Sequence, residues 1–211
     1  MRLAALVRGD YRPGVYRWRS RAHPGAVGRE LAGAGWSGYP LAGQEITDAS
    51  RFFDGCADTL AFPTWFGHNW GALADCLADL SWLPGNGHVL LWERYGRLAG
   101  GDLKAWRRAY ETLGSAVASR VRYAAPPLFV LLRGTGPDTS PVDGAPIPVL
   151  PAVDSGTAGP VRAVPPNSRA AVGSTVPRPG GAATSRGGAA PRGGASASSA
   201  GAAASKSRAG G

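Results

Sequence analysis

The chain has 211 residues, enough for one or two domains, and a formal net charge of +9. Its two cysteines, Cys56 and Cys76, exclude a disulfide framework or a zinc site of ordinary spacing and fit apolar helix stripes as free thiols. No apolar run is long enough for a membrane span or a signal peptide, so we expect a cytoplasmic protein. We also expect no metal and no cofactor.

The first predicted elements are short. Residues 15–18 alternate between apolar and polar and predict a strand. Residues 24–32 begin with proline and are followed by Gly33, an asymmetry that is typical of a helix. Residues 36–41 predict a second strand, and Pro40 favours an edge position for it.

Two helices are predicted in the middle of the chain. Thr47 is placed to cap a helix that runs to about Thr59, with its phenylalanines on one side. Asn69 is a good cap for the next helix, over residues 70–82, which Pro84 and the following glycine terminate.

The last predicted elements complete an α/β pattern. Residues 88–92 and 128–132 are continuous apolar runs, typical of strands that are buried on both faces. Apolar residues at three- and four-residue spacing predict a long helix over residues 102–123. Strands that alternate with helices indicate an α/β fold with a mainly parallel sheet.

Residues 134–211 differ in composition from the rest. They contain 15 Gly and 11 Pro, and no Phe, Tyr, Trp or Cys. Such a segment cannot bury enough apolar surface to offset the entropy lost on ordering, so we expect a disordered tail.

The charge is also unevenly divided. Residues 1–133 contain 16 Lys and Arg against 11 Asp and Glu, and residues 134–211 contain 7 against 3. Residues 45–82 hold six acids and the single base Arg51, a local charge of −5. This local field predicts a basic partner for the segment, whereas the global charge alone favours nucleic acid.

The two faces of the predicted helix over residues 70–82 are unlike. Trp70, Leu73, Leu77 and Leu80 recur at helical spacing and predict the core face. The other face carries small residues, two carboxylates one turn apart and a tryptophan: Gly71, Ala74, Asp75, Ala78, Asp79 and Trp82. A solvated face is the common explanation for such charges. The small residues around them favour a contact surface for a cationic partner.

The loop before this helix contains two consecutive aromatics. We expect Phe66 to pack inward and Trp65 to be exposed near Asp75, although the pattern also allows both rings to be core residues. An exposed tryptophan beside a carboxylate has the composition of a binding hot spot. His68, one residue before the helix cap, is expected to lie close to Asp75, although a lone histidine in a loop is more often a surface residue than a catalyst.

Catalytic signals are missing from the sequence. Its three histidines, His23, His68 and His88, are widely spaced, and there is no nucleophile elbow, His-x-x-x-His pair or phosphate-cradling glycine loop. We therefore expect a protein that is not an enzyme and has no catalytic residues.

The stretch FPTWFGHNWGALADCLADL, residues 62–80, resembles the barstar family of barnase-type ribonuclease inhibitors. Residues 39–46 (YPLAGQEI) and the later HVLLWER and LFVLLRG stretches look like the family's strands. The resemblance covers about residues 36–133, so residues 1–35 form an N-terminal strand–helix extension and residues 134–211 have no counterpart. It implies a small three-stranded parallel sheet flanked by helices.

The resemblance also assigns roles to residues. Asp75 matches the family's phosphate-mimicking aspartate, and Trp65 matches the loop aromatic that stacks on the enzyme. Gly71 and Ala74 stand where the family has an aspartate and often an aromatic, and Glu111 is a candidate for a further carboxylate. The implied partner-binding set is Trp65, Gly67, Asn69, Gly71, Ala74, Asp75 and Asp79. Asp79 is placed to restore part of the charge missing at Gly71.

The implied partner is a secreted, basic, barnase-like ribonuclease, bound one-to-one by a monomeric inhibitor. The alternative is a nucleic-acid-associated adaptor that acts through the basic segment 11–21 and the arginine-dotted tail. The charges of the tail are sparse, which makes nucleic acid the less favoured partner.

Overall fold

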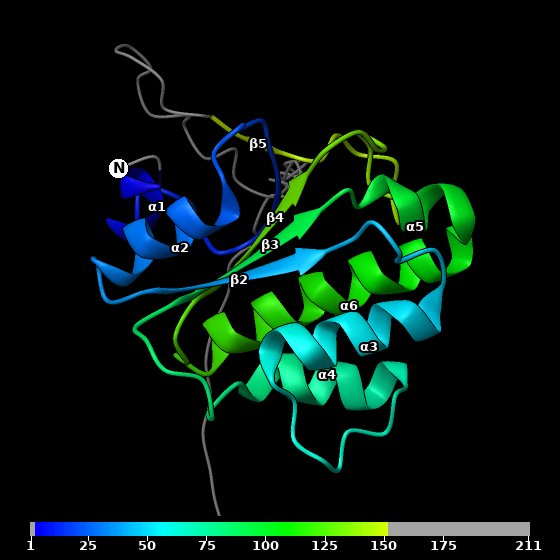
Figure 1. Cartoon of the computed structure of the whole chain (residues 1–211), viewed down its shortest axis with the longest axis horizontal. Coiled ribbons are helices and arrows are strands. Elements are labelled where there is room, and N and C mark those ends of the chain that lie inside the picture. Colours follow the sequence, from blue (N-terminus) through cyan, green and yellow to red (C-terminus); the bar gives the residue numbers. More distant parts are fainter. Residues whose placement is uncertain (1–2, 152–211) are drawn as a thin grey trace, which may run out of the picture. The chain divides into compact units, whose positions relative to one another are not determined.

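The computed structural model of the chain describes residues 3–151, in which helices cover both faces of a parallel sheet (Figure 1). The sheet has five strands in the order β2-β3-β4-β1-β5, and all neighbouring strands are parallel. The strands are β1 (Val15–Trp18), β2 (Ser37–Ala42), β3 (His88–Glu93), β4 (Leu128–Arg133) and β5 (Val149–Leu150). β2 lies at an edge, as the proline within it predicts.

The central strands are apolar because both of their faces are covered. In β3, Leu90 pairs with Tyr39 of β2 on one side and with Val130 of β4 on the other. Residues 88–92 and 128–132 are all buried. The continuous apolar runs therefore predicted these two strands correctly.

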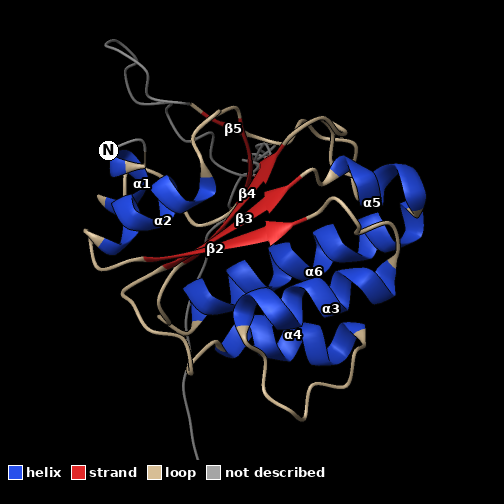
Figure 2. Cartoon of the chain, viewed as in Figure 1, coloured by secondary structure: helices blue, strands red, loops and turns tan. Residues whose placement is uncertain are grey.

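Four helices cover one face of the sheet (Figure 2). They are α3 (Ala49–Leu60), α4 (Trp70–Asp79), α5 (Gly96–Gly101) and α6 (Leu103–Arg122). Aromatic rings join this layer to the sheet: Phe52 of α3 stacks on Trp92 of β3 with 4.7 Å between ring centroids, and Trp92 contacts Trp106 of α6. α5 was not predicted, and α6 agrees with the predicted helix to within a residue.

The other face is covered by α1 (Ala4–Val7) and α2 (Pro24–Ala32). α2 is capped by His23, whose Nδ1 accepts the N–H of Gly25 at 3.1 Å. Leu31 of α2 is fully buried with the sheet residues that point to this face. The alternation along β3 and β4 thus divides the core into two clusters, one on each side of the sheet.

The expected count of three strands is wrong, because β1 and β5 extend the sheet to five. β1 pairs with β4, with Val15 opposite Val130, and Trp18 at the end of β1 is 1% exposed. Residues before the barstar-like region therefore form hydrogen bonds along β4, which would otherwise be an edge strand.

The expected disorder from residue 134 onward is also wrong for residues 134–151. This stretch contains β5, which pairs with β1. Ile147 and Leu150 are each 2% exposed and anchor it to the core. Proline is tolerated here because β5 is an edge strand. Residues 152–211 lie outside the described residues.

The cap of α3 also differs from the prediction. Asp48, not Thr47, is the cap, and its Oδ1 accepts the N–H of Arg51 at 3.0 Å. This hydrogen bond is the main reason that the pKa of Asp48 is lowered. Among residues 3–151, no helix has the combined length and apolarity needed to cross a bilayer.

Candidate protein-binding site

α4 begins at a well-formed cap. Asn69 Oδ1 accepts the N–H of Ala72 at 3.0 Å, and Asn69 Nδ2 donates to the carbonyl of Gly67 at 3.1 Å. One side chain thus caps the helix and fixes the loop before it, as predicted. A Cβ atom at position 67 would lie 2.9 Å from Asn69 Nδ2, so a side chain there would displace the amide group that caps the helix.

The other end of α4 is held by Arg120 of α6. Arg120 Nη1 donates to the carbonyls of Ala78 at 3.0 Å and Asp79 at 2.7 Å, and its Nε donates to the carbonyl of Pro126 at 2.8 Å. The side chain is 1% exposed, and burial lowers its pKa. Sequence reasoning missed this residue, although it follows Val117 by three positions on the apolar stripe of α6.

The inward face of α4 packs as the sequence predicts. Leu73, Cys76 and Leu77 are buried, and Trp70 is partly buried against Phe53 with 4.8 Å between ring centroids. Both free cysteines are buried, and burial raises the pKa of each thiol. A buried thiol with a raised pKa is unreactive, so the cysteines serve as small apolar residues.

The outward face of α4 presents Gly71, Asp75 and Asp79, which recur every four residues and are all exposed. Ala74 and Ala78 lie beside them and are partly buried. Within residues 3–151, the carboxylate of Asp75 makes no hydrogen bond and no ion pair. Small neighbours therefore leave this carboxylate accessible.

The loop before α4 separates its two aromatics. Trp65 is 61% exposed, whereas Phe66 is 6% exposed and contacts Phe62 and Phe53 edge-on. The predicted outward tryptophan and inward phenylalanine are both confirmed. Figure 1 shows this loop at the lower margin of the molecule, next to α4.

His68 pairs with a different carboxylate from the one expected. Its Nδ1 lies 2.9 Å from Oδ1 of Asp54, a residue of α3. The backbone of His68 has φ 46°, a left-handed conformation that costs about 1 kcal/mol in a residue other than glycine. His68 thus holds the loop to α3 immediately before the helix cap.

The six acids of residues 45–82 divide into paired and unpaired groups. Glu45 and Asp48 lie 3.9 and 3.8 Å from Arg51, and Asp54 is paired with His68. The carboxylates of the other three have no ion-pair partner in the part of the chain that the structure describes, and all three are exposed: Asp58, Asp75 and Asp79. The negative field of the segment is therefore concentrated on α4 and the later part of α3.

The predicted extent of α4 to residue 82 is wrong. The helix ends at Asp79 because Leu80 turns into the left-handed conformation, φ 43°, and returns to the core. Trp82 consequently lies beyond the helix, where its Nε1 donates to the carbonyl of Leu60 at 2.9 Å. It is partly buried against Phe62 and does not belong to the exposed face.

The fold and the site together define a small α/β domain with an exposed, acidic helix face directly after an exposed aromatic loop. Residues 39–132 match the family model described as Barstar (barnase inhibitor). These residues of the chain therefore form a barstar-like domain. A search of the curated proteins found no match.

The family match begins within β2 and ends within β4, so β1, α2 and β5 lie outside it. Within it, Glu111, the candidate for a further carboxylate, is partly buried and accepts a hydrogen bond from Arg107 at 3.2 Å. A Cβ atom at Gly71 would lie 3.3 Å from Asn69 Oδ1, a contact that needs only a small adjustment. The backbone therefore does not forbid a side chain at this position.

Proposed function

We propose that the chain is an intracellular inhibitor of a secreted, basic ribonuclease, and that α4 and the loop over residues 61–69 occupy the active site of that enzyme. The barstar-family match supports the class of partner. The observation that carries the proposal is the carboxylate of Asp75, which is exposed and unpaired among the described residues.

The physical basis is replacement of a phosphate by a carboxylate. A ribonuclease cleft must be cationic, because it binds the RNA backbone. A carboxylate that enters such a cleft meets the same cations as a phosphate would. α4 is held at one end by Asn69 and at the other by Arg120, so little conformational entropy remains to be lost on binding.

The other residues of the proposed binding surface contribute an aromatic ring, close approach and a second charge. Trp65, exposed on the loop, supplies an aromatic surface that stacks on the enzyme. Gly71 and Ala74 allow the partner to approach the helix closely, and Asp79 adds a second carboxylate one turn after Asp75. We propose a one-to-one complex with a monomeric inhibitor that takes no part in chemistry.

The alternative of a nucleic-acid adaptor has less support. Its basic segment, residues 11–21, contains strand β1 and is not a free arm. Trp18 is buried, and Arg17 lies 3.9 Å from Asp138. The backbone of this segment is therefore engaged within the fold, although Arg12, Arg19 and Arg21 are exposed.

The proposal is tested by titrating the full chain into a basic, barnase-type ribonuclease and measuring residual RNA cleavage. We expect stoichiometric inhibition that weakens by at least about thirtyfold in Asp75→Asn, since losing one partner of a buried charge pair costs about 2 kcal/mol or more. Asp10→Asn, which removes an exposed carboxylate outside the site, is the matched control and should inhibit like the wild type.

Association should also slow as salt is raised. Barnase and its inhibitor are the standard example of such steering, and this salt dependence is carried over from that pair. Equal inhibition by Asp75→Asn and the wild type would show that the anchor lies elsewhere.

A further inference from the structure

A pocket of about 710 Å³ lies where three parallel strands end. It is lined by residues at the carboxyl ends of β1, β3 and β4 and in the loops that follow them: Trp18, Arg19, Ser20, Arg21, Glu93, Arg94, Gly96, Arg97, Arg133, Gly134 and Thr135. In open α/β sheets, ligands bind at the carboxyl ends of the strands. The volume is within the range of small-molecule sites.

The lining is strongly basic, with five arginines and one acid. The acid, Glu93, pairs with Arg133 at 2.5 Å, which leaves four guanidinium groups without a balancing carboxylate in the lining. Among the described residues, the side chains of Arg19, Arg21 and Arg94 have neither a hydrogen bond nor an ion pair, and Arg97 donates only to the carbonyl of Gln44.

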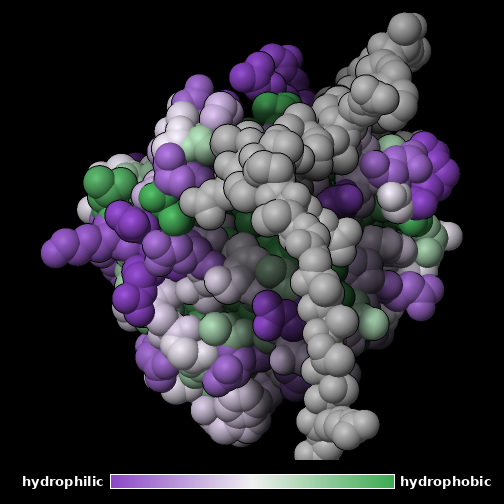
Figure 3. All heavy atoms as spheres, turned by 180° about the vertical axis from the view of Figure 1, so that it is seen from behind, coloured by the Kyte–Doolittle hydropathy of each residue, from purple (hydrophilic) through white to green (hydrophobic). Residues whose placement is uncertain are grey.

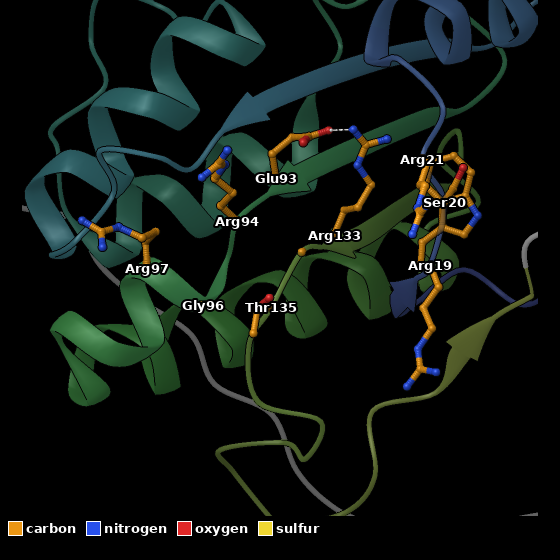
Figure 4. Close-up of a pocket in the computed structure, with 11 residues that line it drawn as sticks. Arg19, Ser20, Arg21, Glu93, Arg94, Gly96, Arg97, Arg133 and Thr135 are labelled. Carbon is orange, nitrogen blue, oxygen red and sulfur yellow. Dashed lines mark ion pairs between the residues drawn. The ribbon is translucent and has the colours of Figure 1, made fainter.

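The arginines approach the pocket from two sides. Figure 4 shows Arg19 and Arg21 on one side and Arg94 and Arg97 on the other, with the Glu93–Arg133 pair between them. Uncompensated like charges around one pocket repel one another, and an anion bound among them relieves this repulsion. Seen from behind, strongly hydrophilic residues also project around the margins of the visible surface (Figure 3).

We propose that this pocket binds a small molecule that carries a diphosphate group. The planar guanidinium group matches the oxygens of a phosphate in a bidentate manner, and arginines on both sides of the pocket suit two linked phosphoryl groups. The hydroxyls of Ser20 and Thr135 are further possible donors.

The lining favours a small ligand over an RNA strand. Proteins that bind single-stranded RNA present exposed aromatic rings on which the bases stack. The only aromatic residue of this lining is Trp18, which is 1% exposed and therefore offers no ring face. Recognition in this pocket is thus directed to phosphate groups and not to bases.

The pocket depends on the N-terminal part of the chain. Arg19 and Arg21 lie outside the region that matches the barstar family, and they reach the ends of β3 and β4 because β1 pairs with β4. The pocket shares no residue with α4 or its loop. The proposal therefore does not rest on ribonuclease inhibition.

Calorimetric titration of the full chain with pyrophosphate, ADP and inorganic phosphate, at constant ionic strength, tests the proposal. We expect saturable binding of pyrophosphate to one site, tighter than binding of inorganic phosphate. The double variant Arg19→Gln/Arg21→Gln should weaken this binding by at least about tenfold, because it removes two charge-assisted contacts. Arg12→Gln/Arg122→Gln removes the same charge from exposed positions outside the pocket and should change the affinity less than about twofold.

Tighter binding of ADP than of pyrophosphate would support a nucleoside diphosphate as the ligand, and equal or weaker binding would support a free diphosphate. The proposal is overturned if none of the three anions shows saturable binding, or if the two double variants weaken pyrophosphate binding equally. It is also overturned if a single-stranded RNA oligonucleotide binds at the pocket while pyrophosphate does not.

Discussion

The acidic face of α4 and the arginine pocket belong to one sheet-based fold but differ in charge and in origin. The α4 face comes from one continuous stretch, which lies in a segment with a charge of −5. The pocket comes from the ends of three strands that are far apart in the chain, and its lining has four more arginines than acids. The net charge of +9 describes neither region, so partners have to be inferred from local fields.

The two regions also differ in rigidity. α4 is fixed by hydrogen bonds at both of its ends, whereas the side chains of Arg19, Arg21 and Arg94 are exposed and have no partner among the described residues. Ordering flexible side chains costs free energy on binding. We therefore expect tight binding at α4 and weaker, salt-sensitive binding in the pocket.

The largest expected effect comes from breaking the rigidity of α4. Arg120→Met should lower the free energy of unfolding by about 4 kcal/mol, because the carbonyls of Ala78, Asp79 and Pro126 all lose their donor. Urea unfolding measures the change. Arg122→Met, at an exposed position two residues later, is the control and should stay within about 0.5 kcal/mol of the wild type. A loss below about 1 kcal/mol in Arg120→Met would show that α4 does not depend on this anchor.

The next largest expected effect is a loss of stability at low pH, which depends on His88 on the α4 side of the sheet and not on the pocket. His88 at the start of β3 is 1% exposed, and burial, followed by the charge of Arg120, lowers its pKa from 6.5 to about 4. The unfolded chain therefore binds the proton more readily than the folded chain. Above about pH 6.5, His88 is neutral in both states and does not lower the stability. As the pH falls from 6.5 towards 4, the free energy of unfolding should decrease by at most about 3 kcal/mol.

This pH dependence is measured by urea unfolding of the wild type and of His88→Phe between pH 7.5 and pH 4. As the pH falls, the free energy of unfolding should decrease more in the wild type than in His88→Phe. If the free energy of unfolding changes equally with pH in the two proteins, folding does not lower the pKa of His88.

The smallest expected effect restores a charge to the α4 face. Gly71→Asp should tighten binding to a basic ribonuclease by about tenfold, since it adds a carboxylate one turn before Asp75. The stability should not fall, because position 71 is in the first turn of the helix, where a negative charge is favourable and glycine is not. Gly71→Asn, with the same shape and no charge, should not tighten binding. Weaker inhibition by Gly71→Asp than by Gly71→Asn would indicate that the partner surface there is not cationic.

Local patterns predicted the α4 region well. The cap at Asn69, the inward Phe66 and the outward Trp65 each depend on a few neighbouring residues, so the sequence contains the necessary information. The exception is Trp82, which was assigned to the exposed face because a left-handed turn at Leu80 leaves no trace in an apolar periodicity.

The features that escaped prediction depend on contacts between distant residues. The strand over residues 15–18 was predicted, but its place in the sheet depends on pairing with β4 far along the chain. β5 pairs with β1 and, with two residues, is too short to show a periodicity. Arg120 looks like an ordinary helix residue until the end of α4 is placed against it. The arginine pocket likewise exists only once β1, β3 and β4 end side by side.

The position of β1 in the sheet has a consequence for how the protein is made on the ribosome. Val15 is synthesised early, but its partner Val130 emerges only when most of the described residues have been translated. Until then, the nascent chain exposes an unpaired β-strand, a state that is prone to misassociation. Such late pairing also slows folding, because a long loop must close before the contact forms. Shielding of this early segment during translation should therefore raise the yield of folded protein.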